Sequence, residues 1–249
     1  MSTRLSTSES GAGQSHELDV QLGSLNELRA SNLVDLVFDE VRGAILDKSL
    51  PPGLRITEAG LAKHLNVSKT PVREALLRLR QIGLIEDDGR RGGRVIAPSR
   101  AAIEQAFEIR EALEAFTARA AAGRATPSQR LAIKRAADES LAGAEAGDRE
   151  AFSTWDAVFH DHIAATTANP RLTGLLDDAC ALIATLRSRD LPHARASIEC
   201  AEGHVAISDA IQAGDGSAAA AAMSAHLLQV KDYILEALAD VLDRPQPPA

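Results

Sequence analysis

The sequence predicts a mainly α-helical protein with an N-terminal winged helix-turn-helix and a C-terminal antiparallel all-helical bundle of about six helices. Three observations lead to this fold class. A capped helical pair is followed at once by a glycine-rich hairpin within residues 31–98. Apolar residues then recur at helical spacing through the rest of the chain, with no convincing strand. Only 3% of the 249 residues are aromatic, so the core must be largely aliphatic.

Composition along the chain sets the expected domain boundaries. Residues 1–30 are rich in Ser, Gly, Glu and Gln and lack apolar patterning, so we expect a disordered tail there. From Leu33 to Leu46 the apolar residues return at helical spacing and predict the first helix of a domain spanning residues 31–98. A helical domain is expected over residues 99–243, followed by a C-terminal tail at residues 244–249.

Two short helices joined by a tight turn are predicted between Ile56 and Gln81. Ser68 follows the turn and is expected to cap the second helix by accepting a hydrogen bond from a first-turn N–H. Pro71 fits that first turn, where a backbone donor is not needed. In a helix-turn-helix the start of the second helix faces base edges in the DNA major groove. A plain helical hairpin with a solvated basic end is the alternative.

A short hairpin is predicted directly after the second helix, which Gly83 is expected to end in a left-handed cap. Strands at Leu84–Glu86 and Arg94–Ala97 would flank a tip rich in glycine and arginine. Arginine supplies forked donors for phosphate, and glycine lets the backbone approach closely. An isolated tip of this kind is as often a solvated turn, but behind a helix-turn-helix it predicts a DNA contact. The predicted DNA-binding residues are Ser68, Lys69, Thr70, Arg73, Arg90, Arg91, Gly92 and Arg94.

The net charge of −8 is unevenly divided between the two expected domains. Residues 31–98 hold 11 Lys and Arg against 9 Asp and Glu, whereas residues 99–249 hold 14 against 22. The positive charge of the first domain is concentrated at Lys69, Arg73, Arg78, Arg80 and the hairpin tip. Local charge density governs phosphate binding, so the acidic total does not exclude a nucleic-acid partner.

The chain shows neither an apolar run of about 18 residues nor a signal peptide, so we expect a cytoplasmic protein without a membrane partner. Cys180 and Cys200 lie in helical stretches without metal-ligand spacing and are predicted to be buried thiols rather than a disulfide.

Amphipathic helices separated by helix-breaking residues are predicted throughout the second domain. Gly, Pro and Asn-Pro pairs mark the breaks, as at Thr126-Pro127, Asn169-Pro170 and Gly214. The expected helices span residues 99–122, 127–145, 148–167, 170–189, 192–213 and 215–242.

Asp156 and His160 are four residues apart and therefore project from one face of a helix. His204 and His226 each fall in the middle of a later helix. Three imidazoles and one carboxylate suit a borderline divalent ion, zinc first, with nickel or manganese as alternatives. His162 points away from Asp156 and is excluded. Each histidine taken singly is more often packed or solvated than a ligand, and spacing cannot show that the helices bring them together.

Four segments of the first domain carry a family resemblance: Leu61-Ala62, Val67 to Leu76, Gly83-Leu84-Ile85 and Gly89 to Val95. On these residues, residues 31–98 resemble the GntR family of bacterial transcription regulators. Lys69 replaces the usual arginine, and Ala59 stands where some members carry another DNA-contacting arginine. The resemblance implies a homodimer on double-stranded operator DNA. Base contacts would then come from Thr70, Arg73 and the predicted hairpin, which is the wing of this fold.

The second domain is similar to the FCD effector domain of the FadR branch, through Asp156 to Ile163, Asn169-Pro170, Gly203 to Asp215 and Ala219 to His226. The resemblance implies one divalent metal ion per chain, held by Asp156, His160, His204 and His226 beneath an effector pocket. It also brings Arg110 near that pocket, where a cation beside a metal suits a carboxylate ligand. The alternative is a surface Arg110 paired with Glu114. Gly203 departs from the usual glutamate.

The sequence therefore predicts a ligand-responsive transcription regulator, a repressor released from its operator by a small organic acid. The alternatives are a metal-responsive regulator and a metal-dependent hydrolase, since an open metal site can activate water. We expect no enzyme, because no convincing general base or oxyanion donor accompanies the metal set.

Overall fold

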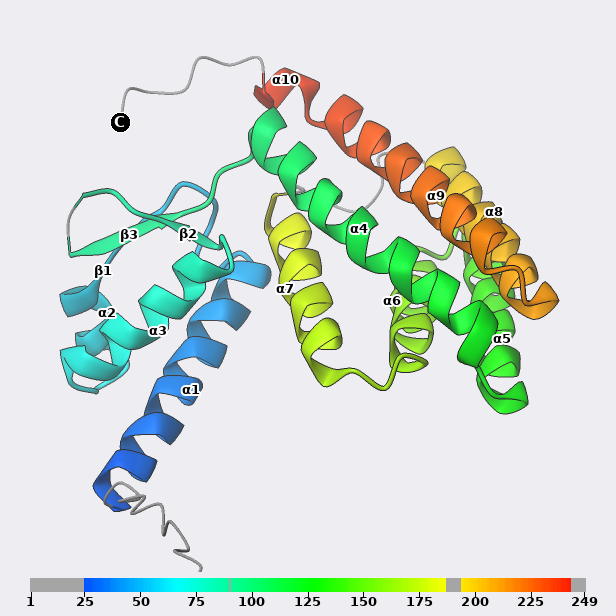
Figure 1. The fold of residues 1–249 in the computed structure, drawn as a ribbon. Helices are drawn as coiled ribbons and strands as arrows, with labels where there is room; N and C mark the ends of the chain where they lie inside the picture. The colour runs from blue at the N-terminus through cyan, green and yellow to red at the C-terminus, as the bar shows by residue number, and fades with distance from the viewer. Residues whose placement is uncertain (1–24, 90, 187–193, 243–249) are drawn as a thin grey trace, which may run out of the picture.

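The computed structural model describes residues 25–89, 91–186 and 194–242. A small domain with a three-stranded sheet stands beside a larger helical domain (Figure 1). The two are joined by the connection from β3 to α4, and α7 lies beside α1. No helix among the described residues is long and apolar enough to cross a membrane.

The small domain contains three helices, α1 (Leu25–Leu46), α2 (Glu58–His64) and α3 (Lys69–Gln81). Buried aliphatic side chains from α1, such as Val41 and Ile45, pack with Leu76 and Leu79 of α3. Helix α3 has the predicted end, and Gly83 beyond it has the left-handed φ of 78°.

The predicted tail at residues 1–30 is wrong at its C-terminal boundary, because residues 25–30 belong to α1. Residues 1–24 lie outside the described residues, as does the predicted C-terminal tail at 244–249.

The sheet has the order β1-β3-β2 and is antiparallel throughout. Its strands are β1 (Arg55–Thr57), β2 (Ile85–Glu86) and β3 (Gly92–Val95), so the predicted strand at Arg94–Ala97 begins and ends earlier. Strand β1 was not predicted. It has a single buried side chain, Ile56, and pairs with a strand distant in sequence, which local patterning does not reveal.

Six long helices form the second domain, as the sequence predicted. They are α4 (Arg100–Arg124), α5 (Pro127–Glu145), α6 (Arg149–Ala165), α7 (Pro170–Leu186), α8 (Ala194–Ala213) and α9 (Gly216–Ala237). The last predicted helix is divided at Leu238, after which the short α10 (Ala239–Leu242) begins. The predicted junction between α7 and α8 falls partly on residues 187–193, outside the described residues.

Side-chain caps explain why these helices start where they do. Ser99, Asp148 and Asp215 each accept a first-turn N–H, at α4, α6 and α9 respectively. Thr126 forms a capping box with Gln129 at the start of α5. Each cap satisfies backbone N–H groups that the first turn of a helix leaves free. These polar residues therefore determine where the helices begin.

Helix α4 runs the length of the helical domain and packs against α9 and α7 (Figure 1). Its buried face is lined by small residues, including Ala106, Ala118 and Ala121. Helices can approach closely across such a face, and the larger core side chains come mainly from other helices, such as Phe159, Ile163 and Met223. This packing brings the middle of α4 close to α6, where the candidate site lies.

Candidate DNA interface and metal-binding cavity

The start of α3 is exposed, as a groove-reading helix requires. Ser68, Lys69 and Thr70 are all exposed, while Pro71 and Val72 are buried beneath them. Ser68 is the N-cap residue, but its side chain makes no capping hydrogen bond, contrary to the prediction. Pro71 is the third residue of α3, one of the positions whose backbone N–H can donate to a capping side chain. Proline has no N–H, so this donor is missing. The Ser68 hydroxyl therefore remains at the surface.

Arg73 lies one turn further along α3 and is held by Glu58, the first residue of α2. Its Nε donates to both carboxylate oxygens, at 3.1 and 3.3 Å, and Nη2 donates to Oε2 at 3.1 Å. This hydrogen bonding holds the pKa of Glu58 below its ordinary value. The Arg73 side chain is still 55% exposed. The guanidinium is thus oriented by a carboxylate while part of it faces solvent.

Two other arginines of α3 make contacts within their own domain. Arg78 pairs with Asp35 of α1 at 2.5 Å and lies 4.3 Å from the centre of the Phe38 ring. Arg80 donates to the carbonyl of Gly92 and so ties α3 to the sheet. Part of the positive charge that the sequence concentrates on α3 is therefore engaged by groups of the small domain.

The wing differs from its prediction mainly at its glycines. Gly92 is buried, and a Cβ there would lie 2.1 Å from the carbonyl oxygen of Ile56. Close pairing of β3 with β1 requires this glycine, so its predicted role in approaching phosphate is not supported. Arg91 is exposed, and Arg94 is exposed while donating to the Gly53 carbonyl at 2.7 Å. Arg90 lies outside the described residues.

A cavity of about 220 Å³ opens in the helical domain between α4, α6 and α7. The predicted residues Arg110, Asp156 and His160 line it. Helix α7 supplies a wall that the sequence did not reveal, with Thr173, Leu176, Asp177, Cys180 and Ala184 facing the same space. These residues recur at helical spacing, but that pattern alone is equally typical of a face packed in the core.

The three predicted histidines come together beside this cavity, from α6, α8 and α9. The ring centre of His160 lies 5.2 Å from that of His204 and 5.4 Å from that of His226, and the last two are 4.7 Å apart. Each can offer a ligand atom within 4.8 Å of the others. His204 and His226 are buried. The structure thus brings the three histidines together, which their spacing in the sequence could not establish.

Glu114 of α4 connects two of the predicted site residues. One carboxylate oxygen pairs with the guanidinium of Arg110, and the other bonds to Nδ1 of His160. Burial alone would raise the pKa of Glu114, but the charge of Arg110 and the His160 contact outweigh it and lower the pKa to about 2. The sequence left open whether Arg110 lies near the pocket or pairs with Glu114 at the surface. Arg110 does pair with Glu114, but it lines the cavity and its side chain is only 12% exposed.

His204 is fixed on both sides of its ring. Nδ1 lies 2.9 Å from the Ser140 hydroxyl of α5, and Nε2 lies 3.4 Å from Oδ1 of Asp156. Burial lowers the pKa of His204, against the attraction of Asp156. Burial and the neighbouring His204 lower the pKa of His226 well below its ordinary value. Both rings are therefore neutral at neutral pH, which is the form that binds a metal.

The donor set fits a divalent metal ion. Nε2 of His160 and Nδ1 of His226 are buried, and neither has a hydrogen-bond partner in the described part of the chain. Buried polar atoms without partners are rare unless an ion or water satisfies them. Nδ1 of His160 meets a carboxylate, which is the usual support for a metal-bound imidazole. His160, His204 and His226 are the residues that could hold the ion together, and Asp156 lies in a second possible ligand group with His204 and Cys200.

Comparison with known proteins agrees with this arrangement. Residues 33–95 match the bacterial regulatory proteins of the gntR family, and residues 105–229 match the FCD domain. The chain belongs to the gntR family. It is 26% identical to the HTH-type transcriptional repressor RspR of Escherichia coli strain K12, over 80% of this chain and 87% of RspR. It is 30% identical to the HTH-type transcriptional regulator LutR of Bacillus subtilis strain 168, over 76% and 95% respectively.

The fold is shared with a solved structure as well. The structure of Escherichia coli McbR/YncC covers 82% of this chain and 97% of its own, with a TM-score of 0.64 at 21% identity. This gntR-family protein is therefore a DNA-binding transcription regulator with an FCD effector domain.

Three residues of this site do not follow from the sequence pattern: Glu114, Ser140 and Cys200. The spacing of Glu114 predicts only a surface pair with Arg110, and neither Ser140 nor Cys200 has the spacing of a site residue. Cys200 Sγ lies 3.8 Å from both Asp156 Oδ1 and His204 Nε2. The available signal was weak: Cys200 precedes His204 by one helical turn, a spacing that also occurs in any packed helix.

Gly203 lies against the His226 ring. A Cβ at position 203 would lie 2.7 Å from Nδ1 of His226, so a larger residue there would require the ring to shift.

Proposed function

We propose that this regulator is a repressor that leaves its operator when a small organic acid binds in the metal-containing cavity of the helical domain. The observation that carries the proposal is the convergence of a cation and candidate metal ligands on one cavity. Arg110, Asp156 and His160 all line it, although they come from two helices. A ligand there can meet a metal ion and a guanidinium together.

One divalent ion per chain is proposed at Asp156, His160, His204 and His226, with zinc first and nickel or manganese as alternatives. Imidazole and carboxylate donors suit these ions, and a fifth or sixth position can remain for a ligand beside the four protein donors. The ion supplies a Lewis-acid contact for one oxygen of a carboxylate. The chain's own residues orient that contact, because Glu114 holds His160 and Ser140 lies beside His204.

The cavity favours a small and anionic occupant. Its volume of about 220 Å³ is below the roughly 300–1,000 Å³ of pockets for drug-sized ligands. Arg110 stays charged, since attraction to Glu114 outweighs burial and its pKa lies above the ordinary value. An incoming carboxylate would share the guanidinium with Glu114 through a charge-assisted hydrogen bond.

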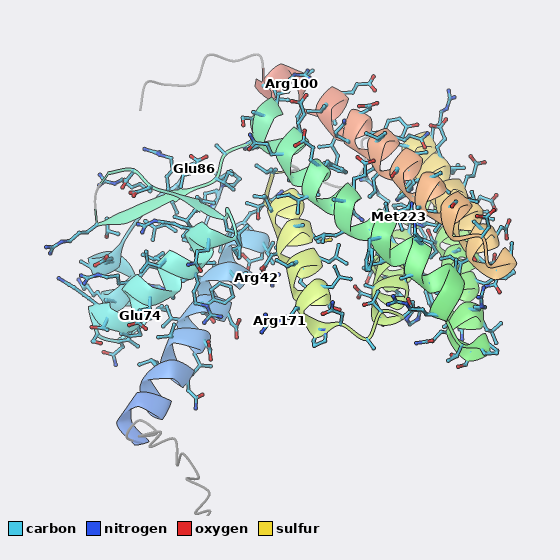
Figure 2. The ribbon with its side chains drawn as sticks, in the orientation of Figure 1. Arg42, Glu74, Glu86, Arg100, Arg171 and Met223 are labelled. Carbon is cyan, nitrogen blue, oxygen red and sulfur yellow. The ribbon has the colours of Figure 1, made fainter. Side chains whose placement is uncertain are left out.

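Helix α7 offers a direct route from this cavity to the DNA-binding domain. Asp177 lines the cavity, and its backbone carbonyl accepts a hydrogen bond from Arg42 of α1 at 3.3 Å. Figure 2 shows Arg42 on the side of α1 that faces α7. Ala181 is buried within the core of the small domain, and Leu182 packs against both cores. A shift of α7 on ligand binding would therefore move α1 as well as the α4 connection.

A homodimer is proposed because palindromic operators match a two-fold pair of recognition helices. The exposed apolar side chains of α4 support it. Ile109 and Phe116 are 52% and 50% exposed and lie seven residues apart, on one face of the helix. Leu228, 43% exposed, adds a further apolar side chain on the neighbouring α9.

The test has two stages on metal-loaded protein. A thermal-shift screen of short mono- and dicarboxylates should find a ligand that raises the melting temperature, because it binds only the native state. That ligand should then weaken operator binding. Metal titration in the absence of any carboxylate is the control. If metal alone changes operator affinity and no carboxylate does, the protein is a metal-responsive regulator instead.

A further inference from the structure

Cys200 lies beside the proposed metal ligands and is buried, with 2% of the residue exposed. It stands one turn before His204 on α8. Its Sγ is 3.8 Å from Nε2 of His204 and 3.8 Å from Oδ1 of Asp156, and those two atoms are 3.4 Å apart. The three atoms therefore form a nearly regular triangle of sulfur, nitrogen and oxygen.

Such a triangle has the size of one face of a tetrahedral coordination sphere. Bonds of about 2.3 Å to sulfur and about 2.0–2.2 Å to nitrogen and oxygen place neighbouring ligand atoms roughly 3.3–3.6 Å apart. The observed edges of 3.4 and 3.8 Å are within a few tenths of an ångström of this range. Little movement is needed for all three atoms to contact one ion.

A second observation independently indicates a ligand at this place. Nε2 of His160 is buried without a partner in the described residues, and the His160 side chain is only 10% exposed. Its ring stands edge-on to His204, with centres 5.2 Å apart. His204 thus belongs to two possible ligand groups, one with His160 and His226 and one with Asp156 and Cys200.

The geometry points to Cys200 as a thiolate ligand of the metal ion, alongside Asp156 and His204. Its thiol proton leaves to solvent when the sulfur binds the ion. This inference rests on the metal site of the proposed function and adds a soft donor to it. Thiolate favours zinc and similar borderline or softer ions over manganese or magnesium, which carboxylate, carbonyl and water suit better.

Cobalt(II) provides the first test, because cobalt bound by thiolate shows an intense near-ultraviolet charge-transfer band that cobalt bound only by nitrogen and oxygen lacks. The full-length protein is titrated with cobalt as wild type, Cys200→Ser and Cys180→Ser. Cys180 is the matched control, since it lines the cavity on α7. It is exposed, so the prediction of a buried thiol is wrong for Cys180 and holds only for Cys200. The band should appear in wild type and Cys180→Ser and be lost in Cys200→Ser. Cobalt affinity should fall in Cys200→Ser by at least the roughly 10- to 100-fold known for residues that only support a metal ligand, because Cys200 would be a ligand itself.

X-ray absorption at the zinc edge of the wild-type protein gives a readout that needs no variant. One sulfur neighbour at about 2.3 Å is expected beside nitrogen and oxygen neighbours at about 2.0–2.2 Å. A bound zinc ion with no sulfur neighbour overturns the role of Cys200 and leaves the proposed function intact. A charge-transfer band that persists in Cys200→Ser, or is lost in Cys180→Ser, also overturns it. Protein that binds neither zinc nor cobalt contradicts the proposed metal site itself.

Discussion

Glu114 on α4 accepts a hydrogen bond from Nδ1 of His160 on α6, and this contact determines which ring nitrogen is left for a ligand. The pKa of Glu114 is lowered to about 2 despite its burial, so the carboxylate is ionised at neutral pH and Nδ1 must be the donor. A neutral imidazole then presents Nε2 as an acceptor. Nε2 is the buried atom that has no partner among the described residues.

Glu114→Gln should weaken both metal binding and folding. Loss of a carboxylate that supports a metal-bound histidine reduces metal affinity roughly 10- to 100-fold. Removal of one partner from a buried ion pair destabilises a protein by about 3–5 kcal/mol, because Arg110 would be left without its counterion. Metal titration and urea unfolding measure the two effects. Glu108→Gln, an exposed position on the same helix, is the control and should change neither.

The same carboxylate should make stability fall in acid. The folded-state pKa of Glu114, about 2, lies below its ordinary value of 4.5. The stabilisation is therefore fully present above 4.5 and is lost as the pH falls from 4.5 toward 2. Urea unfolding of metal-free protein across this range should show a declining free energy of unfolding. The decline should be shallower in Glu114→Gln, and equal slopes in the two proteins would contradict the assignment.

Sequence patterning was sufficient for the helical framework and for part of the site. The helix boundaries followed from local signals, such as the Thr126 capping box and Gly214, which act within a few residues. The sequence also showed that Asp156 and His160 share one face of a helix, since they are four residues apart. Strand β1 and the α7 wall of the cavity did not, because they depend on contacts between distant segments.

The sequence pattern could not reveal the electrostatic roles of the charged residues, for a related reason. Arg110 and Glu114 have the spacing of an exposed helical ion pair, and only the packing of α6 and α7 over them shows that they are buried. Arg78 likewise adds to the positive charge of the first domain in the sequence, and only the structure shows that α1 supplies Asp35 as its partner. The position of a charged residue in the sequence does not show which surface its side chain faces.

His160→Ala should reduce the metal content of the purified protein well below one divalent ion per chain, which is the content proposed for wild type. Its Nε2 is a candidate ligand atom. His162→Ala is the matched control on the same helix, since His162 belongs to neither candidate ligand group found among the described residues. Elemental analysis and circular dichroism check metal content and helicity. Full metal content in the double variant His204→Ala with His226→Ala would refute the site.

Arg73→Ala should weaken operator binding by about 1–3 kcal/mol and relax sequence preference at one position, if the exposed part of the guanidinium reads a base. Glu58→Gln should have a smaller effect of the same kind, because it removes the charge that orients Arg73. Fluorescence titration on the operator and on single-base variants measures both. Unchanged affinity in Arg73→Ala would contradict the placement of α3 in the major groove.

Arg91→Ala should weaken binding to all sequences alike and reduce the slope of log affinity against log salt by about one, as expected for a lost phosphate contact. Arg91 is exposed on the wing, whereas Arg78 is engaged by Asp35. Arg78→Ala is therefore the control of equal charge and should leave the salt slope unchanged. A reduced slope in Arg78→Ala and none in Arg91→Ala would place the DNA on a different face.

Leu182→Ala should separate effector binding from DNA release. Leu182 packs against both domain cores and lies close to Gly83, where a Cβ would be 3.5 Å from its Cδ2. Its side chain does not line the cavity, so effector affinity in the absence of DNA should be nearly unchanged. Leu175→Ala is the control on α7, at a position 56% exposed.

The quantity to measure is the coupling between the two sites. An effector weakens operator binding only as far as it prefers the arrangement that cannot bind DNA, so tight effector binding alone is not sufficient. A coupling of about 1–3 kcal/mol changes operator affinity by roughly 5- to 150-fold, and DNA must weaken effector binding by the same factor. Both factors, obtained from operator titrations with and without effector and from effector titrations with and without operator, should agree in wild type. They should fall together toward one in Leu182→Ala and stay at the wild-type value in Leu175→Ala. Full coupling in Leu182→Ala would show that the signal passes through the connection from β3 to α4 instead of through α7.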